Sequence, residues 1–81
     1  MTEQEALKAI TRLIHKVSGK NVEVSTDHDL RDGNLFDSLD ILVFFMELER
    51  ETGLAVPETE KLVEEGWYKV KKLCEELANK Y

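Results

Sequence analysis

The chain has 81 residues, a formal net charge of −6 at pH 7 and a single cysteine, Cys74. A chain this short predicts one small domain over residues 1–81 without a deep active-site cleft, and a lone cysteine excludes an internal disulfide and leaves no zinc-ligand spacing. No apolar run reaches the roughly 18 residues of a membrane span and residues 1–10 lack a signal-peptide pattern, so we expect a cytoplasmic protein without membrane insertion.

The charges are segregated along the chain. Residues 1–22 hold four basic and two acidic side chains, residues 23–66 hold three and thirteen, and residues 67–81 hold four and two. An acidic middle segment repels nucleic acid and speeds encounter with basic protein surfaces. An ordinary solvated acidic face explains the same composition and stays open as an alternative.

The N-terminal segment predicts one amphipathic helix. Thr2 and Glu5 have the spacing of a capping box, which starts a helix, and Gly19 supplies the stop. Between them six apolar residues recur at helical spacing and define one buried stripe: Ala6, Leu7, Ile10, Leu13, Ile14 and Val17.

Residues 20–37 show no sustained period and predict a long first loop. A connection of this length in a compact domain is uncommon and is usually functional or disordered. Five apolar residues interrupt its polar sequence, and we expect them to pin it to the core: Val22, Val24, Leu30, Leu35 and Phe36.

The second predicted helix runs from Ser38 to Thr52, with Ser38 or Asp37 as its N-cap and Gly53 as its left-handed C-terminal residue. It has two apolar stripes at about 100° per residue. One contains Ile41, Phe44, Phe45, Leu48 and Thr52, and the other contains Leu39, Leu42, Val43 and Met46. A small core cannot bury both stripes, so the second, rimmed by Asp40, Glu47, Glu49 and Arg50, predicts a protein-binding surface. The alternative is that the other helices cover it.

Two further helices complete an all-α prediction. Pro57 suits a first helical position and acids follow it, which predicts a short helix to Glu64 that ends near Gly66. The last helix is expected over Trp67 to Lys80, with an inner face of Trp67, Val70, Leu73, Cys74 and Leu77. The predicted architecture is a four-helix bundle with three longer helices and one short helix.

Ser38 lies where the long loop meets the second helix. A helix N-terminus favours an attached anion, because its free N–H groups and its dipole are positive. Ser38 lacks the companions of an enzyme nucleophile, since the only histidines, His15 and His28, are expected at the surface outside any activating motif. A plain N-cap role is the alternative.

The surroundings of Ser38 resemble the acyl carrier protein family. The matching residues are Leu30, Gly33 and Leu35 in the loop, then Asp37-Ser38-Leu39-Asp40, and later Gly53 and Val56-Pro57 before a short third helix. The resemblance covers nearly the whole chain. It implies a four-helix bundle of acyl-carrier type.

For function, the resemblance implies a carrier that is not itself an enzyme. A phosphopantetheinyl transferase would attach 4'-phosphopantetheine to Ser38, next to Asp37 and Leu39, and the arm would hold acyl or aminoacyl groups as thioesters. An acyl- or aminoacyl-activating ligase and downstream acyl-using enzymes would read the second helix of a monomeric carrier. The positions that match this partner-reading helix are Asp37, Leu39, Asp40, Leu42, Val43, Met46, Glu47, Glu49 and Arg50.

Some residues indicate a subtype within that family. Val43 and Arg50 stand where carriers of bulk fatty acid biosynthesis look acidic. The approach from Gly33 to Ser38, and Val56-Pro57 with the later Trp67, look more like D-alanyl, other aminoacyl or specialised-pathway carriers. Phe44 and Phe45 also fill volume that a long acyl chain would need.

Two other functions are compatible with parts of this sequence. A calcium-binding EF-hand needs oxygen ligands at loop positions 1, 3 and 5, Gly at 6 and Glu at 12. With Gly33 at position 6, position 3 is Leu30 and position 12 is Leu39, so the register fails and no metal site is expected. The second rival is an unmodified helical interaction module that docks a partner on the apolar stripe of the second helix.

Overall fold

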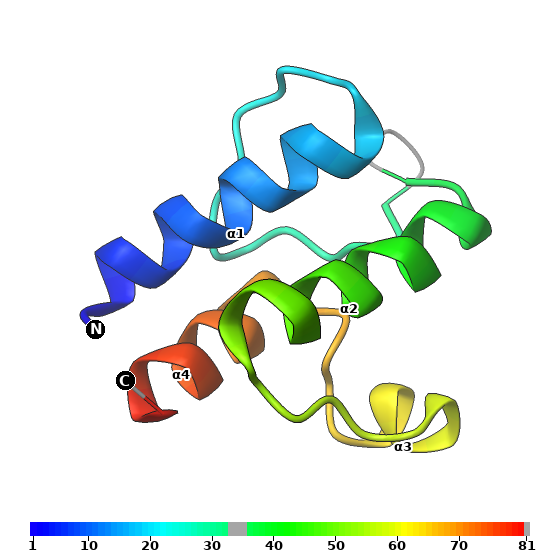
Figure 1. Ribbon diagram of the computed structural model, residues 1–81. Helices are drawn as coiled ribbons and strands as arrows, with labels where there is room; N and C mark the ends of the chain where they lie inside the picture. Colours follow the sequence, from blue (N-terminus) through cyan, green and yellow to red (C-terminus); the bar gives the residue numbers. More distant parts are fainter. Residues whose placement is uncertain (33–35, 81) are drawn as a thin grey trace.

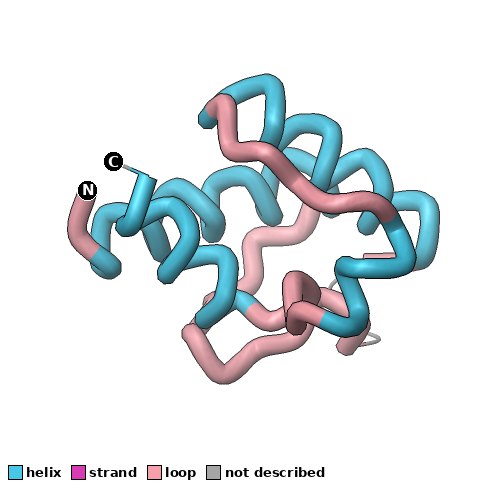
Figure 2. Tube along the Cα trace, turned by 90° about the horizontal axis from the view of Figure 1, so that it is seen from below, coloured by secondary structure: helices cyan, strands magenta, loops and turns pink. Residues whose placement is uncertain are grey.

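The computed structural model describes residues 1–32 and 36–80, and these form a small all-α bundle (Figure 1). Its helices are α1 (Glu3–Ser18), α2 (Ser38–Thr52), α3 (Thr59–Glu64) and α4 (Val70–Lys80). In the described part of the chain there are three longer helices and one short one, as predicted. The start of α1 and the end of α4 lie near one another in both views (Figures 1 and 2).

The ends of α1 are set by local sequence. The Thr2 hydroxyl accepts a hydrogen bond from the N–H of Glu5, and the Glu5 carboxylate accepts one from the N–H of Thr2, which is the predicted capping box. The bond from the Thr2 N–H lowers the pKa of the Glu5 carboxyl. Gly19 ends the helix with a φ of 71°, a left-handed conformation that favours glycine.

One hydrophobic cluster holds the bundle together. α1 packs against both α2 and α4, so the buried stripe of α1 supplies the centre of the core. The largest fully buried side chains come from all three longer helices and from the loop: Phe44, Ile10, Ile14, Leu30, Leu48, Leu73, Leu77, Val70 and Cys74. Leu7, Val17 and Ile41 pack against this cluster but are only partly buried.

The long loop is pinned to the core as expected. Val24, Leu30 and Phe36 are buried and Val22 is half-buried, while Leu35, the fifth predicted anchor, lies outside the described residues. Leu30 also pairs with the turn before α4, since its N–H donates to the Tyr68 carbonyl at 2.7 Å. The loop is therefore fixed against α4 as well as against the core.

The predicted start of the last helix is wrong. Residues 65–68 form a turn, in which Gly66 has a left-handed φ of 74° and its carbonyl accepts from the Lys69 N–H at 3.1 Å. α4 therefore begins only at Val70, whose N–H donates to the His28 carbonyl in the loop at 3.0 Å. Trp67 therefore lies outside α4, although it is buried in the core as expected. Cys74 on α4 is buried, which raises the pKa of its thiol to about 11.

The predicted role of Pro57 is also wrong in detail. Glu58 is the N-cap of α3 and Thr59 is the first helical residue, so Pro57 lies one position before the cap. Its fixed φ still stiffens the chain that enters α3. None of the described helices is long and apolar enough to cross a bilayer.

Candidate functional site

Ser38 is exposed and is the first residue of α2. Asp37 is the N-cap, because its carboxylate accepts a 2.8 Å hydrogen bond from the Asp40 N–H. This decides between the two predicted caps, and it leaves the Ser38 hydroxyl without a capping role. Within the described residues that hydroxyl makes no hydrogen bond.

The amides beside Ser38 are suited to an anion. The N–H groups of Ser38 and Leu39 belong to the first turn and have no carbonyl partner within the helix. The Asp40 amide is taken by Asp37, and the Ile41 amide donates to the Asp37 carbonyl at 3.2 Å. A phosphodiester on Ser38 would therefore suit these two amides, which donate to no described residue, and the positive end of the α2 dipole.

Phe36 holds the chain in place two residues before Ser38. Its side chain is only 6% exposed, and its ring packs on Phe44 of α2 with 5.5 Å between centroids. Phe44 in turn meets Phe45 edge to face at 5.4 Å. A buried aromatic cluster thus anchors the N-terminal end of α2 from beneath, while Ser38 faces outward. Gly33 and Leu35 of the matched loop motif lie outside the described residues.

The second apolar stripe of α2 is exposed. Leu39 is 68% exposed, Leu42 51%, Val43 40% and Met46 70%, whereas Phe44, Phe45 and Leu48 are buried. The expectation that the core covers only one stripe is confirmed. Exposed large apolar side chains so close together on one helix are typical of an interaction surface.

One exposed apolar residue was missed from the sequence. Val63 on α3 is 59% exposed, whereas its neighbour Leu62 is buried. Adjacent residues differ by about 100° around a helix, so Val63 points away from the part of the core that Leu62 enters.

Some of the charged residues around the stripe already form ion pairs or hydrogen bonds within the fold. Glu47 accepts from Lys16 of α1 at 3.2 Å and lies 3.5 Å from Arg50. Glu49 accepts a 3.2 Å hydrogen bond from the Val56 N–H, so it holds the chain that follows α2. Asp37 and Arg50 are exposed, and Asp40 is half-buried. The charges around the stripe are therefore of both signs, and some of them are already paired before a partner binds.

The histidines are not simple surface residues, which corrects the expectation. His15 is half-buried, and its Nε2 lies in hydrogen-bonding contact with the Val22 carbonyl. His28 is also half-buried, and its Nδ1 accepts from the Ser25 N–H at 3.0 Å. Both shape the long loop, and neither has a hydrogen bond with Ser38 in the part of the chain that the structure describes.

A second contact network ties the loop to the turn before α4. The Arg31 guanidinium forms a bidentate pair with Asp29, at 3.0 and 2.9 Å, and lies 4.9 Å from the centre of the Tyr68 ring. Tyr68 packs edge to face on Phe45 of α2, at 5.8 Å. The side-chain bond from Arg31 lowers the pKa of the Asp29 carboxyl. The loop before Ser38 is thus braced from both α2 and the turn before α4.

Across 1–32 and 36–80, no three His, Cys, Asp or Glu side chains come together in a group that could hold an ion. Two acidic residues of the loop hold local turns: the Asp29 side chain accepts from the Arg31 amide at 2.8 Å, and the Asp32 side chain accepts from the Asp29 amide at 3.3 Å.

Comparisons with models of protein families, with curated proteins and with solved structures give no match to this chain.

Proposed function

We propose that this chain is an acyl carrier protein and that Ser38 is its site of phosphopantetheine attachment. The observation that carries the proposal is an exposed serine hydroxyl with no hydrogen bond to the described residues, at the first position of a helix whose outer stripe is apolar and exposed. A structural N-cap serine would use its oxygen on a backbone amide, but Asp37 does that instead.

Each neighbouring residue has a role in this proposal. Asp37 caps α2 and leaves the first amides open to a phosphodiester on Ser38. Phe36 fixes the approach of the chain through its contact with Phe44. Leu39, Val43 and Met46 supply apolar contact to visiting enzymes. The bound arm would contribute a terminal thiol that forms thioesters with acyl or aminoacyl groups, and this chain would carry them without catalysing a reaction.

The proposed partners follow from the same surface. They are a phosphopantetheinyl transferase, an acyl- or aminoacyl-activating ligase and enzymes that use the carried group. The acidic middle segment would speed encounter with basic faces on these enzymes, and we place the carrier in the cytoplasm as a monomer.

The core favours a small cargo within the proposed class. Phe44 is fully buried and Phe45 is 6% exposed, and Phe36 packs beside them. This aromatic cluster fills the volume behind the N-terminal half of α2, where a long chain carried on Ser38 would otherwise enter. The contacts favour an aminoacyl or short acyl group, as in aminoacyl and specialised-pathway carriers.

Coexpression with a broad-specificity phosphopantetheinyl transferase tests the proposal. We expect the intact mass to rise by one phosphopantetheine and the modified peptide to contain Ser38. Ser38→Ala should abolish the gain, and Ser25→Ala, which removes another exposed hydroxyl, should leave it unchanged.

The second candidate is an unmodified interaction module, favoured by the exposed stripe of α2 alone. That module would gain no mass in the same experiment, while still binding a partner through Met46 and Val43. An unchanged mass with active transferase would therefore decide against the carrier.

A further inference from the structure

The exposed side of α2 ends in a cation. Leu39, Val43, Met46 and Arg50 recur every three or four residues, so they form one line along the helix. The first three are exposed apolar residues, and the Arg50 side chain is 73% exposed. This line, which we call the α2 ridge, is therefore apolar for most of its length and positively charged at its C-terminal end.

The N-terminal end of the α2 ridge carries the opposite charge. Asp37 is exposed and Asp40 is half-buried, and no described residue forms an ion pair with either carboxylate. The Asp37 carboxylate accepts the Asp40 N–H, which is not a charged partner. Two negative charges without a nearby cation thus lie beside Ser38.

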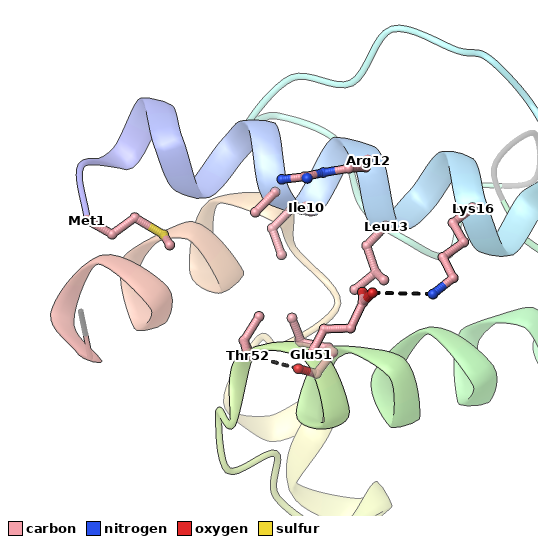
Figure 3. Close-up of a pocket in the computed structure, with 9 residues that line it drawn as sticks. Met1, Ile10, Arg12, Leu13, Lys16, Glu51 and Thr52 are labelled. Atoms are coloured by element: carbon pink, nitrogen blue, oxygen red, sulfur yellow. Dashed lines mark hydrogen bonds and ion pairs between the residues drawn. The ribbon is translucent and has the colours of Figure 1, made fainter.

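The acidic residues nearest Arg50 are already balanced. Lys16 of α1 lies 3.2 Å from Glu47 and 3.2 Å from Glu51, and Figure 3 shows the second of these pairs. The bonds raise the pKa of the Lys16 ammonium group, which therefore stays charged. Glu47 also lies 3.5 Å from Arg50. Two cations balance two carboxylates here, and the most exposed of the four side chains is that of Arg50.

Helix electrostatics alone do not account for Arg50. The helix dipole favours a cation in the last turn, but Glu49 and Glu51 stand on either side of Arg50 in that turn. The pair between Arg50 and Glu47 joins two residues of one helix at the surface, and such pairs add little stability. Arg50 therefore contributes little to the fold, although it is prominent on the exposed side of α2.

The two ends of the α2 ridge act on a partner as separate charges. Asp37 and Arg50 are thirteen residues apart, which is about 20 Å along a helix at 1.5 Å per residue. Salt screens exposed charges over about 8 Å at physiological ionic strength. A docking protein therefore responds to the sign of the charge at each end and not to the net charge of the chain.

We propose that Arg50 selects the enzymes that dock on α2, by favouring a partner with a carboxylate at that end and disfavouring a partner whose face is basic throughout. The fitting partner presents a basic side chain to Asp37 and Asp40, an apolar groove to Val43 and Met46, and an acidic side chain to Arg50. Opposite charges orient the docked partner, and like charges exclude a wrong one. The inference rests on the proposed carrier function and specifies the chemistry of its partners.

The probe is a phosphopantetheinyl transferase whose carrier-binding face is basic along its whole length, and a broad-specificity transferase is the reference. We expect kcat/KM of the basic-faced enzyme to be about ten-fold higher for Arg50→Glu than for the wild-type chain, because a repulsion becomes an attraction. Arg50→Gln should fall between the two. In about 0.5 M salt the gain should shrink to less than two-fold, because the charges are screened.

Arg12→Glu is the matched control. It makes the same change of charge at an exposed position of α1, outside the α2 ridge, and should alter kcat/KM less than two-fold. The melting temperatures of Arg50→Glu and Arg12→Glu are compared as well. A lower melting temperature for Arg50→Glu with an unchanged rate would assign Arg50 to the end of the helix and overturn the proposal.

Charge reversal on the enzyme tests the expected carboxylate directly. The basic residues of its carrier-binding face are replaced by glutamate one at a time, and each variant enzyme is assayed with both chains. One replacement should raise kcat/KM for the wild-type chain and lower it for Arg50→Glu, because it places a carboxylate opposite residue 50.

The possible failures are distinguishable. Equal rates for Arg50→Glu and Arg12→Glu, a gain that persists in high salt, or no enzyme variant with opposite effects on the two chains would overturn the role of Arg50 while Ser38 is still modified. If neither transferase modifies Ser38 in any variant, the carrier function itself is wrong and this inference fails with it.

Discussion

The Asp37 carboxylate caps the amide of Asp40 at 2.8 Å, and so the residue that starts α2 is the one directly before Ser38. Asp37 and Ser38 therefore have different roles at the start of α2. Asp37 satisfies the backbone, and Ser38 is exposed with a hydroxyl that makes no hydrogen bond to a described residue. The stability of the helix start and the chemistry at Ser38 can therefore be separated by substitution.

Replacing Asp37 tests this separation. Asp37→Ala should lower the free energy of unfolding by about 1 kcal/mol, because the Asp40 amide loses its acceptor. Asp37→Asn keeps an oxygen for that bond and should lose far less. Urea denaturation of both variants measures the effect, and an equal loss in the two would contradict the capping role.

The same pair of variants bears on partner recognition. If a transferase reads the charge of Asp37, Asp37→Asn should slow modification of Ser38 although the fold is intact. A normal rate with Asp37→Asn would assign Asp37 to the helix alone.

Local signals predicted the helix ends well. The capping box of Thr2 and Glu5, the left-handed Gly19 and the left-handed Gly53 all act within a few residues of the end that they fix. Such bonds depend on the sequence nearby and not on the rest of the fold. The period of the apolar residues likewise predicted which side of α2 is buried.

The failures share a different cause. The first amide of α4, that of Val70, bonds to His28, more than forty residues earlier in the chain, and no local pattern near Trp67 encodes that bond. The ion pair between Glu47 and Lys16 also arises from the packing of α1 on α2. The spacing of residues in the sequence does not predict contacts between distant segments.

Acid should weaken the brace between the loop and α4. Because Arg31 lowers the pKa of Asp29 in the folded protein, the pair stabilises the fold fully above the unfolded carboxyl pKa. That contribution is lost as the pH falls through the lower folded pKa. Asp29→Asn should therefore cost about 0.2–1 kcal/mol at pH 7, the range of a partly exposed pair, and nothing once Asp29 is protonated.

Urea denaturation at several pH values measures this difference. Asp27→Asn is the matched control, since it removes an exposed carboxylate from the same loop. A cost for Asp29→Asn that stays constant down to strongly acidic pH would show that the ion pair is not its source.

Thiol reactivity should report the prosthetic group directly. Burial raises the pKa of Cys74 to about 11, so the unmodified, folded chain should react with iodoacetamide very slowly at pH 8. The proposed carrier form should instead show one fast thiol, that of the arm. Unfolding in denaturant should expose Cys74 and add one reactive thiol in each form.

Alkaline pH gives a further check on Cys74. A folded pKa above the unfolded value means that the buried thiol stabilises the fold at neutral pH and that this contribution is lost as the pH rises toward about 11. Cys74→Ala should flatten that alkaline loss. Rapid alkylation of Cys74 in the folded, unmodified chain would contradict its burial.

The two faces of α2 should respond to substitution in opposite ways. Phe44 is fully buried and contacts both Phe36 and Phe45, so Phe44→Ala should lower the free energy of unfolding by about 3–5 kcal/mol. Met46 is 70% exposed, so Met46→Asp should change it by no more than about 0.5 kcal/mol. Urea denaturation of both variants compares the two faces.

Met46→Asp should instead impair docking, because it places a charge in the apolar contact of the proposed partner surface. We expect kcat/KM for modification by the transferase to fall about ten-fold, since truncating a central apolar contact commonly costs 1 kcal/mol or more. Asn79→Asp adds the same charge at an exposed position of α4 and should leave the rate near wild type, which controls for net charge. Equal rates for Met46→Asp and Asn79→Asp would show that the transferase does not bind the second apolar stripe of α2.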